Sequence, residues 1–211
     1  QEWQTDDSVP ELLSNEIALW RIDPLDLSSF EEACVRLLSA EETRRLQRFV
    51  NAQSRREFLL CRGILRILLA HLTGQAPKAM ALGEGSQGKP QIVDDENQHS
   101  ISFNVSHTEN LCLIACSRDC EVGVDVEKVH AIKDLFRMAQ TYLSPEEFAA
   151  WRELDGREST GRFIEYWCAK EAILKAAGAG LSIHPSQVNT FEALTGHGVR
   201  GVQENGGFFD F

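Results

Sequence analysis

Two short stretches, "GVDVEK" and "WCAKEAILK", carry the residues of this chain best suited to chemistry. The first places Asp125 and Glu127 two residues apart, and the second places Glu171 four residues before Lys175. Residues two apart in a strand point to the same side, and residues four apart in a helix lie on one face. Each pair alone is an ordinary surface pattern, because exposed charges pair freely. Three carboxylates from two elements together indicate a site for a hard divalent cation.

Such a cation would come with a phosphate-bearing ligand. Mg²⁺ prefers one or two carboxylates, water and substrate phosphates, and Mn²⁺ accepts the same hard oxygen ligands. Lys175, Lys170 and Lys89 would bring positive charge to those phosphates. The stretch "FNVSHT" adds Ser106 and His107, which point apart and form no catalytic triad, although His107 is able to donate to a phosphate. The chain has no Walker A loop and no G-x-G-x-x-G fingerprint.

Positive charge is concentrated in one segment of an otherwise acidic chain, whose formal net charge is −11. The arginines of this segment are Arg44, Arg45, Arg48, Arg55, Arg56, Arg62 and Arg66. They form either a solvated helical face, paired with Glu41 and Glu42, or a local site for an anion with several charges. The acidic balance argues against nucleic acid as a partner.

The first half of the chain supplies several elements to position these residues. Residues 15–23 are expected to form a strand in which Ile17 and Leu19 alternate with polar or small neighbours. "SAEE" is a capping box, with Ser39 as the cap and Glu42 three residues later. A helix is predicted from this box to about 49, followed by a longer helix over 53–72 that ends near Gly74. A polar loop is predicted over 85–100. Three strands are predicted after it, over 101–105, 111–116 and 121–127.

The second half repeats this arrangement. "SPEE" is a second capping box, with Pro145 at the first helical position. A helix to about 154 and a longer helix over 160–177 follow, and Gly178 ends the second. "RGILR" in the first long helix matches "EAILK" in the second. We therefore expect an α+β fold of two similar halves related by a pseudo-two-fold, with the ligand site in the cleft between them.

Length and composition are those of a globular protein. The 211 residues suit one large domain or two small ones. No apolar run reaches the roughly 18 residues that a membrane span needs, and no signal peptide is visible after Gln1. The six cysteines lack both the pattern of a disulfide framework and the C-x-x-C pairs of a zinc site. We expect a protein of the reducing cytoplasm, without membrane contact.

The order of four motifs resembles that of a known family. "GKP", "FNVSH", "VGVDVE" and "WCAKEAILK" follow one another as in the phosphopantetheinyl transferases of the surfactin-synthetase-activator type, and the resemblance runs from about residue 17 to 181. It implies two similar α+β halves, here 1–118 and 119–211, with coenzyme A between them. It also implies transfer of the phosphopantetheine arm to a serine of an acyl or peptidyl carrier protein, with adenosine 3′,5′-bisphosphate as the other product.

The resemblance also assigns roles to single residues. Asp125, Glu127 and Glu171 match the family's Mg²⁺ ligands, and Lys175 matches its pyrophosphate lysine. Five further residues match positions that contact the nucleotide in the family: Lys89 and Pro90 beside the adenine, Ser106 and His107 at the phosphates, and Arg45 at the 3′-phosphate.

Two departures from the family pattern affect these roles. Glu57 stands where relatives often carry a basic residue, so Arg55, Arg56 and Arg62 remain alternatives for the 3′-phosphate contact. The chain also ends at "GGFFDF", short of the last strands that the family leads one to expect.

The expected chemistry is attack of a carrier serine on the pyrophosphate phosphorus that bears the pantetheine arm. Glu171 would take the serine proton, directly or through a metal-bound water, and Lys175 would neutralise the developing charge. Residues 131–143 carry an apolar stripe that is either core or, through Phe136 or Met138, a carrier-docking surface. A non-catalytic coenzyme A-binding module and a different Mg²⁺-dependent phosphotransferase are the alternatives. A monomer is expected.

Overall fold

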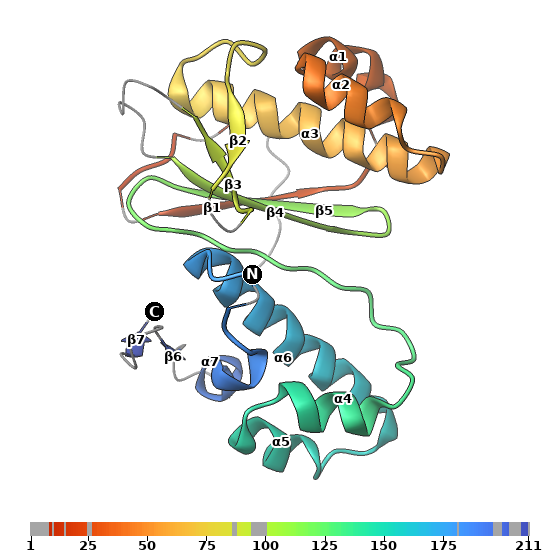
Figure 1. The fold of residues 1–211 in the computed structure, drawn as a ribbon, viewed down its shortest axis with the longest axis vertical. Helices are drawn as coiled ribbons and strands as arrows, with labels where there is room; N and C mark the ends of the chain where they lie inside the picture. The colour runs from red at the N-terminus through yellow and green to blue at the C-terminus, as the bar shows by residue number, and fades with distance from the viewer. Residues whose placement is uncertain are drawn as a thin grey trace.

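The chain folds into an α+β structure with two visibly separate halves (Figure 1). The computed structural model describes residues 9, 11–14, 16–24, 27–85, 88–93, 101–180, 182–195, 200–202 and 208–210. The elements of the N-terminal half are β1 (Ile17–Ile22), η1 (Ser28–Phe30), α1 (Glu31–Leu37), α2 (Ala40–Gln47), α3 (Ala52–Thr73), β2 (Leu82–Glu84), β3 (Pro90–Ile92), β4 (Ser102–Thr108) and β5 (Leu111–Ser117). Those of the C-terminal half are α4 (Leu135–Tyr142), α5 (Pro145–Trp151), α6 (Gly156–Ala177), η2 (Pro185–Gln187), α7 (Phe191–Thr195), β6 (Arg200–Val202) and β7 (Phe208–Asp210).

An antiparallel sheet with the order β1-β5-β4 supports the N-terminal half. One face of this sheet packs against α3, and the core between them includes Ile22, Leu65 and Ile114. The predicted strand β1 is confirmed, but Ile17 and Leu19 are 62% and 45% exposed. The alternate residues of the strand face α3, because β1 is an edge strand and the helix covers only one side of it.

Both predicted capping boxes are present and fix the start of α2 and of α5. The hydroxyl of Ser39 accepts from the Glu42 backbone N–H at 3.2 Å, and the Glu42 carboxylate accepts from the Ser39 N–H at 2.7 Å. Ser144 and Glu147 make the same pair of bonds at 3.3 and 2.7 Å. Each box satisfies backbone donors that a helix leaves unpaired at its first turn.

The two long helices have equal lengths and similar ends. Both α3 and α6 contain 22 residues, and each ends at a glycine in the left-handed conformation, Gly74 with φ 73° and Gly178 with φ 62°. A residue with a Cβ is strained at such a φ, so these glycines define the C-termini. The prediction for α6 began four residues too late, because the helix starts at Gly156, just after Asp155.

The predicted strand over 121–127 is wrong, because this segment makes no strand ladder. Its backbone is held instead by side chains of the neighbouring strand: Val122, Val124 and Val126 donate their N–H groups to Ser102, Asn104 and Ser106 of β4. The valines still alternate inward, since Val122 and Val124 pack against Ala115. The segment therefore runs beside the sheet, between the two halves (Figure 1).

Part of the segment 85–100, predicted as a polar loop, forms a short strand. Residues Pro90–Ile92 form β3, which pairs with β2 in a short antiparallel hairpin. Residues 86–87 and 94–100 of that loop lie outside the described residues. Near the end of the chain, β6 pairs with β7. No helix within the described residues is long and apolar enough to cross a bilayer.

Candidate active site

The site begins where the 121–127 segment touches the C-terminal part of α6. Gly123 lies so close to this helix that a Cβ at its position would be 1.9 Å from the Ala172 carbonyl oxygen and 2.4 Å from the Ala176 nitrogen. Only glycine allows this approach. The contact brings Asp125 of the segment beside Lys175 of the helix.

Asp125 and Lys175 form the centre of a small polar network. The Lys175 ammonium is 2.6 Å from Asp125 Oδ1 and also donates to the Val124 carbonyl and the Ser106 hydroxyl, at 3.2 and 3.3 Å. The Ser106 hydroxyl donates to the same Asp125 oxygen at 2.8 Å. The Asp125 side chain is only 6% exposed. Ser106 is buried, so here its hydroxyl orients the Asp125 carboxylate.

The other Asp125 oxygen is the feature that best suits a cation. Among the described residues, Asp125 Oδ2 is the buried side-chain oxygen that has no hydrogen-bond partner, which is costly unless something binds there. Glu171 is close by. Burial raises its pKa, the carboxylates of Asp125 and Glu127 raise it further, and Lys175 opposes them. Shared repulsion of this kind is what a divalent cation relieves.

The three carboxylates are near one another without forming a closed ligand set. No three His, Cys, Asp or Glu side chains in the described part of the chain are arranged to hold a metal ion. Glu127 is exposed. The chemistry of the donors fits a hard divalent cation: Asp125 and Glu171 would hold it, with Glu127 beside them.

Two residues that sequence reasoning missed shape this network. Gly123 permits the close approach described above, and its only signal in the sequence is its position at the head of "GVDVE". Cys168 lies one turn before Glu171 on α6. Burial raises the pKa of its thiol to about 12, assisted by the negative charges of Asp125 and Glu127. The thiol therefore stays protonated beside these carboxylates.

A pocket of about 340 Å³ opens beside this network and has walls from both halves of the chain. Its N-terminal wall includes Lys89, Pro90 and Asn104, and its C-terminal wall includes Glu171 and Lys175. The Lys89 ammonium also joins the halves, since it donates to the carbonyls of Val122 and Ala176 at 3.0 and 3.1 Å and pairs with Glu121 at 2.6 Å.

A second pocket, of about 530 Å³, gathers four of the seven clustered arginines. We call it the arginine pocket; its lining residues include Arg44, Arg45, Arg48, Arg62, Phe58, Leu82, Gly83, Glu84 and Pro90. The Arg45 guanidinium lies 5.2 Å from the centre of the Phe58 ring. Arg62 is held by Glu42 at 2.5 Å. Pro90 lines both pockets, so they adjoin.

Arg55 and Arg56 lie apart from the arginine pocket. They line a different depression, where Arg56 pairs with Glu31 at 2.6 Å. Glu57 faces the turn between β4 and β5, because its carboxylate accepts the Asn110 N–H at 3.3 Å. Of the three alternatives raised by the sequence, Arg62 is therefore the one that the fold brings to Arg45.

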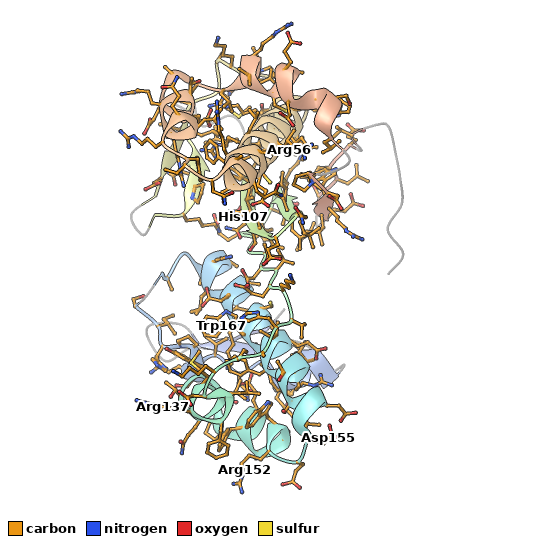
Figure 2. The ribbon with its side chains drawn as sticks, turned by 90° about the vertical axis from the view of Figure 1, so that its right-hand side faces the viewer. Arg56, His107, Arg137, Arg152, Asp155 and Trp167 are labelled. Carbon is orange, nitrogen blue, oxygen red and sulfur yellow. The ribbon has the colours of Figure 1, made fainter. Side chains whose placement is uncertain are left out.

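His107 and Ser106 point to opposite sides of β4, as adjacent strand residues must. Ser106 is buried against Asp125, whereas His107 is exposed. Figure 2 shows His107 near the junction of the two halves and Arg56 well away from it. His107 is thus accessible to a ligand at the junction.

Lys170 is another predicted site residue that the structure places elsewhere. Its side chain has no exposed surface, and its ammonium pairs with the equally buried Glu147 at 2.6 Å. It also donates to the carbonyls of Pro185 and Val188. All three N–H donors of the ammonium are engaged in the interior, so the prediction that Lys170 contacts a ligand phosphate is wrong.

Comparison with known proteins covers both halves. A family model described as "4'-phosphopantetheinyl transferase, N-terminal" matches residues 26–119, and one described as "4'-phosphopantetheinyl transferase superfamily" matches residues 121–207. The 4'-phosphopantetheinyl transferase HetI of Nostoc sp. is 36% identical over 172 residues, which are 81% of this chain and 72% of that protein.

Two further relatives agree with this result. The putative 4'-phosphopantetheinyl transferase slr0495 of Synechocystis sp. is 39% identical over 158 residues, 75% of this chain and 64% of that protein. A 4'-phosphopantetheinyl transferase of Bacillus subtilis is 28% identical over 154 residues, 72% of this chain and 66% of its own length. The matched part thus spans about two thirds of the relatives' length. With both halves matched and the carboxylate, lysine and arginine residues in place, this chain belongs to the 4'-phosphopantetheinyl transferase superfamily.

Proposed function

We propose that this protein is a transferase of the surfactin-synthetase-activator type that moves the 4'-phosphopantetheine arm of coenzyme A to a serine of an apo acyl or peptidyl carrier protein. Adenosine 3′,5′-bisphosphate is the second product, and the reaction depends on Mg²⁺, with Mn²⁺ as an alternative. The observation that carries the proposal is the junction at Pro90 between the carboxylate–lysine pocket and the arginine pocket.

The two adjoining pockets suit the two ends of coenzyme A. Arginine forks bind phosphate by paired hydrogen bonds, so Arg45 and Arg62 are placed to hold the 3′-phosphate, with Lys89 and Pro90 beside the adenine. The pyrophosphate then lies near Lys175 and Glu171. His107 is on the opposite side of β4 from Ser106 and is not part of this pocket's lining. The pantetheine arm leaves through the opening between the halves.

Each residue of the site has a separate role in the transfer step. The carrier serine oxygen attacks the phosphorus bearing the pantetheine arm, and the bond to the departing bisphosphate breaks. Glu171 accepts the serine proton, directly or through a water. Lys175 neutralises charge on the phosphate oxygens. A bound divalent cation, held by Asp125 and Glu171, would add Lewis-acid stabilisation of the same charge.

The carrier protein needs a docking surface, and we place it on α4. Phe136 is 58% exposed there, and Met138 is half-buried. Phe136 also packs edge-on against Phe148, with ring centres 5.6 Å apart. An exposed aromatic side chain is a common anchor for a partner helix.

The direct test is to incubate the protein with coenzyme A, Mg²⁺ and apo carrier proteins, and then to weigh the carrier by mass spectrometry. The expected result is a gain of one phosphopantetheine arm. Fatty-acid, polyketide and peptide carriers should each be tried, and no gain on any of them would reject the proposal.

A pair of variants separates a transferase from a non-catalytic coenzyme A-binding module. Glu171→Ala should abolish transfer while coenzyme A still binds. Glu165→Ala is a matched control, because Glu165 lies on the same helix with an exposed side chain paired to Arg162. If wild type and both variants bind coenzyme A equally and none transfers, the binding module is correct.

We further propose that the protein works as a monomer in the reducing cytoplasm, with halves divided near residues 118 and 119. Both walls of the pocket come from one chain, and all six cysteines are free thiols. Light scattering of the purified protein tests the monomer.

A further inference from the structure

The most deeply buried charges of the C-terminal half are Glu147 and Lys170, which have no exposed surface. We call this pair the C-terminal clamp. Glu147 is the capping-box residue of α5 and Lys170 lies on α6. The pair thus joins the two helices in the core, and both partners also bind backbone beyond α6.

The clamp holds the segment that follows α6. The Lys170 ammonium donates to the carbonyls of Pro185 and Val188, and the first of these bonds is 3.0 Å long. Glu147 accepts from both the N–H and the hydroxyl of Thr190 at 2.7 Å. The segment around η2 is therefore fixed at three points by two side chains.

This segment is a wall of the pocket that contains Glu171 and Lys175. Ile183 and Pro185 line that pocket together with Lys89 and Pro90. The clamp itself never reaches the pocket, because its side chains are fully buried. The clamp therefore affects a bound ligand only indirectly, by fixing the position of the pocket wall that contains Ile183 and Pro185.

The N-terminal half contains the same device, which we call the N-terminal clamp. The buried Arg66 pairs with Glu42 of the other capping box at 2.7 Å and donates to the carbonyls of Pro77 and Met80, at 2.5 and 3.1 Å. These carbonyls precede β2, whose residues line the arginine pocket. Each half thus fixes one wall of one pocket.

The two clamps agree position by position. Arg66 and Lys170 are each the fifteenth residue of a 22-residue helix, and Glu42 and Glu147 are each the third residue of the preceding helix. In both halves the two carbonyls that the buried cation binds are three residues apart, and the first belongs to a proline: Pro77 and Met80 for Arg66, and Pro185 and Val188 for Lys170.

Stability alone does not account for a buried ion pair of this kind. A well-packed apolar pair is often as stable as a buried salt bridge, because desolvation offsets the attraction. An apolar pair, however, would take the buried cation away from both carbonyls, and in the C-terminal half only the Pro185 carbonyl would keep a donor, the Val188 N–H. A cation with several N–H groups satisfies both carbonyls and fixes their direction.

We propose that the two clamps position the ligand-binding walls, so that Lys170 and Arg66 are positioning residues for the pockets. The ligand's identity as coenzyme A rests on the proposed function, whereas the effect on the wall does not.

The test uses the double variant Glu147→Gln with Lys170→Met in the full chain. It leaves no unpaired charge, keeps an amide oxygen for Thr190 at the expense of the Ser144 N–H contact of the capping box, and removes the cation from both carbonyls. The expected result is faster hydrogen exchange in residues 182–189, whose amides at Gln187 and Val188 are bonded within the segment itself. Coenzyme A affinity measured by calorimetry should fall about tenfold, the loss expected from two charge-assisted hydrogen bonds that act indirectly.

Controls separate positioning from general destabilisation. Exchange in residues 77–84, the wall held by the N-terminal clamp, should not change. Lys170→Arg should retain both exchange protection and affinity, since an arginine makes these contacts at Arg66. If the double variant does not fold, Glu147→Gln with Lys170→Leu, which also lacks a donor for the two carbonyls, replaces it with the same expectations.

Each outcome decides the question. Unchanged exchange in 182–189, or faster exchange with unchanged coenzyme A affinity, overturns the positioning role. Faster exchange in both walls alike also overturns it, because the effect is then global loosening. If wild-type protein binds no coenzyme A, the proposed function fails, and the exchange measurement still decides whether Lys170 holds the wall.

Discussion

Gly123→Ala tests the close approach on which the site depends. A Cβ at this position lies 1.9 Å from the Ala172 carbonyl oxygen, whereas ordinary contact begins at 3.4 Å. The segment and helix α6 must therefore separate by about 1.5 Å, the difference between these two distances. If the segment takes the whole shift, the 2.6 Å contact between Lys175 and Asp125 lengthens to about 4.1 Å, beyond salt-bridge range.

The consequences of this shift are larger for activity than for stability. Overpacking of this kind costs about 1–3 kcal/mol, and each kcal/mol lowers the melting temperature of a protein of this size by about 2–4 °C. Misplacement of catalytic groups by about 1 Å costs roughly 100-fold in rate. We expect a folded variant whose transfer rate, followed by the mass of the carrier, falls by about 100-fold.

Gly161→Ala is the matched control, because its added Cβ meets nothing within 4 Å. Gly161 lies inside α6, where alanine is favoured over glycine by up to about 1 kcal/mol. This variant should melt slightly higher than wild type and transfer at the same rate. If Gly123→Ala shows the melting temperature and the rate of wild type, the close approach is absent and our account of the site is wrong.

The remaining predictions concern charge, thiols and docking. Burial raises the pKa of Glu42, but the hydrogen bonds from Arg66 and the Ser39 N–H, together with the charges of Arg62 and Arg66, outweigh burial and hold the pKa below its ordinary value. The stability gained from this carboxylate is therefore present above pH 4.5 and lost as the pH falls, so the unfolding free energies of wild type and Glu42→Gln should converge in acid. Burial raises the pKa of Cys116 to about 12, whereas Cys120 is exposed. A thiol reagent at pH 8 should therefore modify Cys120 at once and Cys116 only after denaturation. Equal rates of modification at the two cysteines would contradict the burial of Cys116. Phe136→Glu should raise the KM for the carrier at least about tenfold, as expected for an aromatic anchor, with little change in melting temperature; an unchanged KM would remove α4 as the docking surface.

Features that are decided within a few residues could be predicted from the sequence. The Ser39 and Ser144 capping boxes and the helix-ending Gly74 and Gly178 are such features, because each satisfies its own neighbouring backbone groups. The pairing of Asp125 with Lys175 required more, since fifty residues separate them. There the sequence supplied the residue types, and the motif order supplied the expectation that they meet.

The strand predicted over 121–127 failed for a nonlocal reason. Its alternating valines have the period of a strand, and Val122 and Val124 do face inward. What the sequence does not show is that side chains of β4, beginning with Ser102 and Asn104, would take the N–H groups that a strand gives to carbonyls. Periodicity reports which side of a segment is buried and not what its backbone binds.

The neighbours Lys170 and Glu171 show most clearly where sequence reasoning ends. Successive residues of a helix point about 100° apart, so only one of two adjacent charges can face the pocket when the other faces the core. The sequence shows that they diverge, but the direction of each depends on where α5 packs. Glu147 of α5 is buried, and a buried carboxylate requires a cation as its partner. Lys170 is the residue of α6 that faces Glu147 and pairs with it. Glu171 is left on the pocket wall. The capping box that starts α5 thereby determines which charge of "KE" can take part in the chemistry.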